Sequence, residues 1–176
     1  MEQEVPSVRF TKCIDSSTPS TASSAKKELK LNESSTPNVG AAAPVTPQGF
    51  GDLLEAPLIA HLATIRKDGQ PQNNPMLFAW DGERISLSLT KTRKKYENLL
   101  AEPRVAISVT DPENPYRYIE LRGSVDRIEE DDGNAFVNSL AKRYMGQDEY
   151  TWDPPGAERV IVSFVPDASS HQGEPN

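Results

Sequence analysis

Cysteine and histidine are scarce in this sequence of 176 residues. Cys13 is the single cysteine, so the chain can form neither an internal disulfide nor a cysteine cage for a metal. The two histidines, His61 and His171, belong to no motif of a hydrolase, a zinc enzyme or a phosphate-binding loop. The sequence therefore shows no set of residues for metal catalysis or for hydrolysis by a proton relay, and we expect no metal site. A redox cofactor that carries its own chemistry would need only binding, orientation and exclusion of water.

Long apolar runs and an excess of positive charge are also missing. No stretch approaches the roughly 20 apolar residues that cross a bilayer, and the first residues lack the basic-then-apolar order of a secretory signal. The net charge of -7 repels polyanions. We therefore expect a soluble, cytoplasmic protein that takes a small molecule as its substrate and binds neither a membrane nor a nucleic acid.

The composition divides the chain into a tail and one domain. Residues 1–47 are rich in serine, threonine and proline and show neither helical nor strand periodicity, which is typical of a disordered segment. Residues 48–168 have the length of an ordinary single domain. The polar residues 169–176 are expected to form a short flexible tail.

In most of the domain, apolar residues recur at every second position, which is typical of strands. Two Asp-Gly turns, at residues 68–69 and 81–82, join three of these strands as hairpins. Gly123 in the middle of a long strand indicates a bend. Two strands are apolar on both faces and are expected to be central ones, 58–65 and 160–165. The remaining predicted strands are 72–80, 85–90, 104–110 and 117–128.

Three helices interrupt the strands. The first is predicted from Thr46-Pro47 to Pro57, and the second from the N-cap Thr92 to Pro103. The third starts near Asp131-Asp132 and ends at Gly146. The sequence thus predicts a mainly β fold, a small antiparallel barrel of six strands with about three helices packed at its openings.

The strongest local anomaly is the basic cluster Arg93, Lys94 and Lys95, which falls in the first turn of a predicted helix. Cations at this end oppose the helix dipole, at about 0.3–1 kcal/mol each. An anion bound there would remove the conflict, since a helix N-terminus with basic side chains forms a cradle for a phosphate or a carboxylate. The alternative is an ordinary solvated basic surface.

Two other segments contain residues suited to a flat ligand. Asn74, Pro75 and Met76 lie in a predicted strand, where proline marks an edge, a bulge or a ligand approach, and the amide can hydrogen-bond a heteroaromatic ring. The segment 115–118 places Arg117 between Tyr116 and Tyr118, which suits stacking and pairing with an acid. Its alternative is two tyrosines at the edge of the core beside a surface arginine.

Motifs distributed over residues 48–168 together resemble the flavin-binding split β-barrels of the pyridoxamine 5'-phosphate oxidase-like superfamily. The likeness is closest to the branch that uses coenzyme F-420, an 8-hydroxy-5-deazaflavin. The early motifs are LATI at 62–65, DGQPQ at 68–72, NPM at 74–76, TRKK at 92–95, NL at 98–99 and PRVA at 103–106. The later ones are NPYRY at 114–118, RG at 122–123 and LAKRY at 140–144 with Gly146.

This resemblance implies an antiparallel Greek-key split barrel of the FMN-binding type, assembled as a homodimer with two cofactors in grooves at its interface. Arg93 and Lys95, with Lys94 between them, match the positions that hold the cofactor phosphate. Residues 74–76 and Thr90 match those that approach the ring. The segment from Tyr116 to Ile119, which includes Arg117 and Tyr118, matches one near the cofactor tail or the partner subunit.

The activity implied by the resemblance is that of an oxidoreductase that transfers hydride between reduced coenzyme F-420 and a conjugated small molecule, such as an enone, a quinone or a tetrapyrrole. No side chain is required as a nucleophile. The C-terminus lacks the arginine-rich sequence with which pyridoxamine-phosphate oxidases hold their substrate, so that vitamin activity is not expected. Residues 72–80 lack the arginine and lysine of FMN-using oxidases. The alternatives are an FMN-dependent oxidase or reductase of the same superfamily, and a non-enzymatic protein that binds a cofactor or another small ligand.

Overall fold

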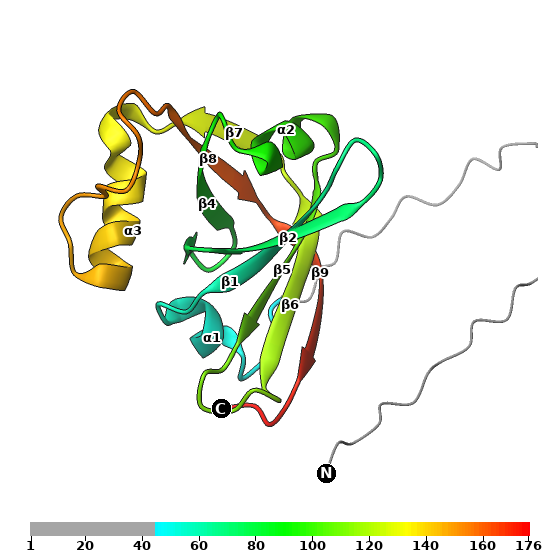
Figure 1. Cartoon of the computed structure of the whole chain (residues 1–176). Coiled ribbons are helices and arrows are strands. Elements are labelled where there is room, and N and C mark those ends of the chain that lie inside the picture. The colour runs from blue at the N-terminus through cyan, green and yellow to red at the C-terminus, as the bar shows by residue number, and fades with distance from the viewer. Residues whose placement is uncertain (1–44) are drawn as a thin grey trace, which may run out of the picture. The chain divides into compact units, whose positions relative to one another are not determined.

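The structure, a computed structural model, describes residues 45–176. Two antiparallel sheets make up most of it (Figure 1). The five-stranded sheet has the order β2-β1-β5-β6-β9, with bounds β1 Ala60–Ile65, β2 Pro71–Met76, β5 Arg104–Thr110, β6 Tyr118–Ser124 and β9 Pro166–Gln172. The four-stranded sheet has the order β3-β4-β8-β7, with bounds β3 Phe78–Trp80, β4 Ile85–Thr90, β7 Arg127–Glu130 and β8 Arg159–Phe164.

The predicted mainly β, antiparallel split-barrel fold is confirmed, and the two sheets do not close into a continuous barrel. The described residues form nine strands where the sequence predicted six. Two predicted strands each divide where the chain passes from one sheet to the other, and β9 was not predicted. The predicted strand 72–80 divides at Leu77 into β2 and β3, which belong to different sheets. The predicted strand 117–128 divides in the same way into β6 and β7.

The bend predicted at Gly123 lies at a close approach of the chain to itself. The pairing of β6 with β9 shifts in register between Arg122 and Gly123. A Cβ at Gly123 would lie 2.8 Å from the ring of Phe164 and 2.9 Å from the carbonyl oxygen of Val165. Only glycine therefore lets the end of β6 pass this close to the junction of β8 and β9.

The inward faces of both sheets form one hydrophobic core. As predicted, β1 lies between two neighbours, β2 and β5, and β8 lies between β4 and β7. β8 is covered on both faces, whereas the outer face of β1 is exposed at His61. The core side chains include Leu62, Phe78, Leu87, Ile107, Ile119, Leu121, Val162 and Phe164.

The three α-helices are α1 (Gly51–Glu55), α2 (Lys94–Ala101) and α3 (Ala135–Met145). α1 is shorter than predicted, because residues 47–50 form a turn, in which the amide of Phe50 donates to the carbonyl of Pro47. The N-cap of α2 is Arg93 and not Thr92. Gly146 ends α3 with a positive φ of 70°, as its position predicted.

A short 3-10 turn, Asp132–Asn134, precedes α3. Asp131 still caps the helix, because its carboxylate oxygens accept hydrogen bonds from the amides of Phe136 at 2.7 Å and Val137 at 2.9 Å. Val137, Leu140 and Ala141 of α3 are buried. This cap therefore fixes where α3 begins and which face it buries.

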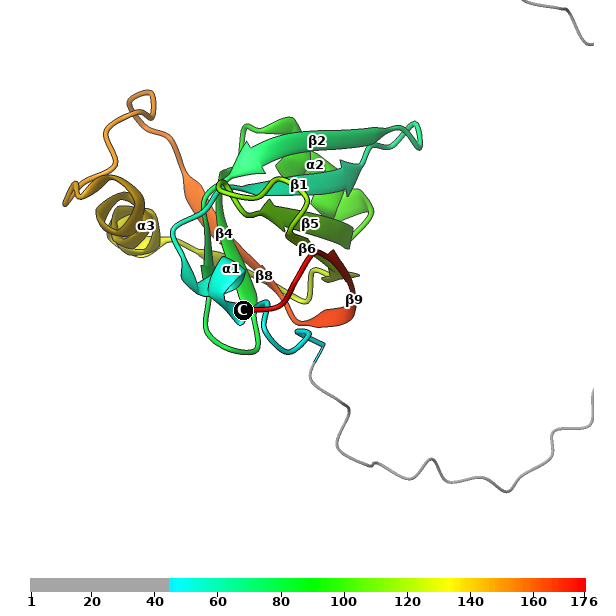
Figure 2. The ribbon, with the colours of Figure 1, turned by 90° about the horizontal axis from the view of Figure 1, so that it is seen from below.

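β9 extends beyond residue 168, where the sequence analysis ended the domain, and reaches Gln172. Its pairing with β6 orders residues that were expected to form a flexible tail. The strand is polar and lies at the edge of its sheet, so hydrogen bonding and not apolar alternation holds it. The chain then returns to α1, where the amide of Asn176 donates to the carbonyl of Gly49 at 2.9 Å (Figure 2).

The disordered tail predicted for residues 1–47 lies outside the described residues, apart from 45–47. Within residues 45–176, no helix has both the length and the apolar character needed to span a bilayer.

Candidate functional site

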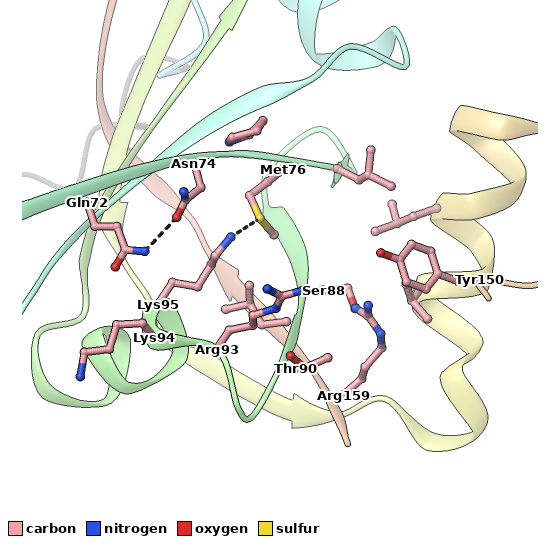
Figure 3. Close-up of a pocket in the computed structure, with 15 residues that line it drawn as sticks. Gln72, Asn74, Met76, Ser88, Thr90, Arg93, Lys94, Lys95, Tyr150 and Arg159 are labelled. Atoms are coloured by element: carbon pink, nitrogen blue, oxygen red, sulfur yellow. Dashed lines mark hydrogen bonds between the residues drawn. The ribbon is translucent and has the colours of Figure 1, made fainter. Parts of the chain in front are cut away.

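A cavity of about 520 Å³ lies where β2, β4, the start of α2 and α3 meet. Both polar and apolar side chains line it, and they come from several elements (Figure 3). Gln72, Asn74 and Met76 come from β2, Ser88 and Thr90 from β4, Arg93, Lys94 and Lys95 from the start of α2, and Val137 and Leu140 from α3. Pro75, Leu77, Leu89, Tyr150 and Arg159 complete it.

The wall formed by β2 follows from strand alternation. Gln72, Asn74 and Met76 occupy every second position and are half-buried, while Asn73 between them is exposed. Gln72 Nε2 donates a hydrogen bond to Asn74 Oδ1 at 3.0 Å. The structure thus places the predicted residues Asn74, Pro75 and Met76 at the cavity and adds Gln72, which the sequence analysis did not select.

The wall formed by the start of α2 is cationic. Among residues 45–176, Arg93 and Lys95 make no ion pair, whereas Lys94 pairs with Glu97 at 2.6 Å and points away from the other two (Figure 3). Lys95 is half-buried, and its Nζ lies 2.9 Å from Met76 Sδ. Burial, together with the nearby charge of Arg93, lowers the pKa of Lys95 below its ordinary value of 10.5.

The beginning of α2 adds its own positive potential to these side chains. Its N-cap, Arg93, makes no side-chain capping hydrogen bond, so the first amides of the helix lack that partner. The positive end of the helix dipole and two uncompensated cations therefore lie together at this wall of the cavity. This arrangement favours a bound anion, as the sequence analysis expected for this cluster.

Thr90, the predicted ring-proximal residue of β4, is buried in the cavity wall with 6% of its surface exposed. Its Oγ1 lies 3.4 Å from Thr92 Oγ1. Next to it on the same sheet lies Arg159, which is 8% exposed.

Arg159 was missed by the sequence analysis, and its charge is already compensated. Its guanidinium donates to both carboxylate oxygens of Asp153 and, at 2.8 Å, to Ser88 Oγ. The ring of Tyr150 lies over it, with 4.5 Å between the guanidinium carbon and the ring centroid. Arg159 thus fixes the loop before β8 against the cavity. Asp153 lies only six residues before Arg159 in the chain, whereas Ser88 of β4 is brought to it by the fold. The sequence analysis did not connect Arg159 with the cavity, because that connection depends on the pairing of two distant strands.

The four residues 116–119 do not line this cavity. Tyr116 is 77% exposed, and Ile119 is a core residue that is 1% exposed. Tyr118 is half-buried at the start of β6. Their assignment to a groove shared with a partner subunit stays a prediction.

Arg117 has a structural task within the chain. Its guanidinium pairs with Asp52 at 2.7 Å and with Asp111 at 3.1 Å, and it donates to the carbonyls of Gly49 and Glu174. It therefore ties α1 to the end of the chain, and these contacts engage four of its five guanidinium donors. They lower the pKa of the Asp52 carboxyl, chiefly through the hydrogen bond from Arg117.

Comparison with known proteins gives two kinds of match. The family model described as pyridoxamine 5'-phosphate oxidase matches residues 47–168. A solved structure named "F420 Reductase" is 50% identical, with a TM-score of 0.65, and the match covers 71% of this chain and 98% of that one. No curated protein matches the chain.

Two further solved structures resemble the fold at lower identity. The conserved hypothetical protein Rv2991 from Mycobacterium tuberculosis is 29% identical with a TM-score of 0.55, over 69% of this chain and 80% of that one. General Stress Protein 26 from Bacillus anthracis is 24% identical with a TM-score of 0.54, over 73% of this chain and 93% of that one. The sequence motifs, the split barrel and the family match agree, and the chain belongs to the pyridoxamine 5'-phosphate oxidase family.

Proposed function

We propose that this protein is an oxidoreductase that binds coenzyme F-420 in the cavity beside β2 and α2. The observation that carries the proposal is the pair of uncompensated cations, Arg93 and Lys95, at the uncapped start of α2. A cofactor phosphate supplies the anion that this wall lacks. The 50% identity to a structure named "F420 Reductase" supports the deazaflavin over other phosphate-bearing ligands.

The residues present fit such a cofactor in two further respects. The cavity of about 520 Å³ is within the usual range of small-molecule sites. Leu77, Leu89, Val137 and Leu140 provide apolar surface for a flat ring, and the amides of β2 provide hydrogen bonds to its edge. Arg93 and Lys95 would hold the phosphate, and Asn74, Pro75, Met76 and Thr90 would lie against the ring.

The chemistry that the reduced deazaflavin supplies is hydride transfer to an electron-poor conjugated double bond. The chain contributes binding, alignment and exclusion of water. α3 and the loop held by Arg159 wall the cavity off from solvent on one side, so that side chains and not water face the acceptor there. We accordingly assign no side chain as nucleophile, and we propose that the substrate is an enone, a quinone, a tetrapyrrole or a similar compound.

We further propose that the active form is a homodimer. In the single chain the outer face of β1 is exposed at His61 and only partly covered at Ala63 and Ile65, although it is a central strand. Ile59 and Tyr116 are also exposed, at 44% and 77%. A second copy would cover this apolar surface and bring the exposed Tyr116 toward its partner's cofactor. Light scattering should give twice the mass of the chain, and a monomer at micromolar concentration would contradict the shared groove.

The test of the activity is oxidation of reduced coenzyme F-420 with a panel of conjugated acceptors. We expect turnover of at least one acceptor class and a purified protein without flavin colour. A yellow protein with the absorbance of FMN would favour an FMN-dependent oxidase or reductase. Tight binding of reduced coenzyme F-420 without turnover of any acceptor would favour a cofactor carrier.

A further inference from the structure

A chain of hydrogen bonds connects the wall of the cavity to Asn98, a residue of α2 that does not line it. Asn98 Nδ2 donates to Thr64 Oγ1 and to Gln72 Oε1, each at 3.0 Å. Gln72 Nε2 in turn donates to Asn74 Oδ1 at 3.0 Å, as Figure 3 shows. Asn98, Gln72 and Asn74 therefore form a relay of three side-chain amides, which we call the amide relay.

The amide relay starts at a buried residue. Asn98 is fully buried, with 0% of its surface exposed. Both hydrogens of its amide are used, while its Oδ1 finds no hydrogen-bond partner among residues 45–176. A buried carbonyl without a partner costs stability, so a residue that only filled this space would be better replaced by an apolar one. The cost is accounted for if the orientation of the Asn98 amide serves a purpose elsewhere.

The orientation of Asn98 determines the orientation of the next two amides. Because Asn98 presents a donor, Gln72 turns its carbonyl oxygen toward Asn98 and its nitrogen toward Asn74. Asn74 accordingly turns its carbonyl oxygen toward Gln72, and its Nδ2 has no partner within the described part of the chain. If the Asn98 amide were flipped by 180°, its oxygen would face Gln72, and each hydrogen bond between these amides would run in the opposite direction. The free group of Asn74 would then be its carbonyl oxygen, an acceptor, and not its NH₂ group, a donor.

We propose that Asn98 is a positioning residue that acts through Gln72 to make the donor end of Asn74, and not its acceptor end, available to the ligand. The cavity wall formed by β2 then selects a ligand with a hydrogen-bond acceptor, such as a ring carbonyl, at this position. The identity of the ligand rests on the proposed function, whereas the relay itself does not.

A purely structural role makes a different prediction. Asn98 also donates to Thr64, which is buried in β1 and lies outside the cavity. If Asn98 only attached α2 to the sheet, its bonds to Thr64 and to Gln72 would be equivalent, and the loss of either would affect stability alone. Thr64→Val removes the first bond with little change in volume and is therefore the matched control.

The experiment has two measurements on the full chain. The first is the NMR resonances of the Asn74 side-chain amide in the free protein, for wild type, Asn98→Leu and Thr64→Val. We expect Asn98→Leu to shift them although the two residues do not touch, and Thr64→Val to leave them in place. Unchanged Asn74 resonances in Asn98→Leu would overturn the relay. If Asn98→Leu does not fold, Gln72→Met interrupts the same chain and takes its place.

The second measurement is a double-mutant cycle on the dissociation constant of coenzyme F-420. We expect Asn74→Ala and Asn98→Leu each to weaken binding about 5- to 10-fold, and the double variant no more than Asn74→Ala alone. Losses that multiply would overturn action through Asn74. If the wild type binds no coenzyme F-420, the proposed function fails, and the NMR measurement still decides the relay.

Discussion

At the scale of single residues, Lys95 carries a charge that no ion pair within residues 45–176 compensates. It is half-buried near Arg93, and its pKa is lowered for that reason. We expect Lys95→Ala to leave the free energy of unfolding unchanged or raise it slightly, because a first-turn cation is removed. Coenzyme affinity should fall roughly 10- to 150-fold with the lost charged hydrogen bond.

The control for this variant is Lys142→Ala, which removes an equal charge from an exposed position of α3 away from the cavity. Lys142→Ala should change neither the free energy of unfolding nor the coenzyme affinity by much. Chemical unfolding and equilibrium titration of the same preparations measure both. An unchanged affinity in Lys95→Ala would show that the basic cluster is only a solvated surface.

The lowered pKa of Lys95 also predicts a pH dependence. Between this lowered pKa and 10.5, the unfolded chain binds more protons than the folded chain, so the free energy of unfolding should rise with pH in that window. Coenzyme affinity should fall over the same window, since Lys95 loses the charge that holds the anion. Comparison of wild type with Lys95→Met isolates this contribution, and identical pH profiles would contradict it.

The residues that sequence could identify were those whose signal is local. Arg93, Lys94 and Lys95 are adjacent in the chain, and Asn74 and Met76 are adjacent on one face of a strand. Asn98 could not be recognised, because its partners come from distant elements, and neither could the contact of Arg159 with Ser88 of β4. Arg117 was predicted to bind a ligand, and this stays a prediction. The sequence did not indicate its contacts with α1, Asp111 and the chain end, because it does not show that these segments are close.

At the scale of elements, the cap of α3 decides whether the apolar wall of the cavity is in place. We expect Asp131→Ala to lower the free energy of unfolding by about 0.5–2 kcal/mol, since two amides lose their acceptor. Coenzyme affinity should also fall, because Val137 and Leu140 of this helix line the cavity.

The neighbouring substitution Asp132→Ala serves as the control, since Asp132 is exposed and precedes the capped amides. Its effect on stability should stay within about 0.5 kcal/mol. Thermal unfolding of the two variants beside the wild type gives the comparison. Equal destabilisation by both would mean that local charge and not the cap is responsible.

Most elements were predictable, whereas the places where the chain changes sheet were not. Period-two alternation located the strands around Leu87 and Ile107, and proline and glycine located the ends of α2 and α3. The residues from Met76 to Trp80 are all apolar, so no break in the pattern at Leu77 shows that β2 and β3 belong to different sheets. β9 was missed because a polar edge strand has no apolar face to reveal it.

At the scale of the whole molecule, Arg117 joins the two ends of the described chain. Its side chain is 5% exposed, while that of its partner Asp52 is 41% exposed, so the pair is only partly shielded from water. We expect Arg117→Met to lower the free energy of unfolding by about 3 kcal/mol, the lower end for breaking a buried pair. Coenzyme affinity, measured where the variant remains folded, should not change.

This variant also separates two interpretations of the same residue. An affinity that falls along with stability would place Arg117 near the cofactor of a partner subunit, as the family resemblance implied. An unchanged affinity would show that Arg117 serves only to join the ends of the chain.

The central claim is that the cationic wall beside β2 binds an anionic deazaflavin. The most direct measurement is a fluorescence titration of coenzyme F-420 into the wild type and into the Arg93→Ala, Lys95→Ala double variant, at low and at high salt. We predict saturable quenching by the wild type that weakens as salt rises, and much weaker binding by the double variant with little salt dependence. No saturable quenching, or equal affinity of the two proteins, would contradict the claim.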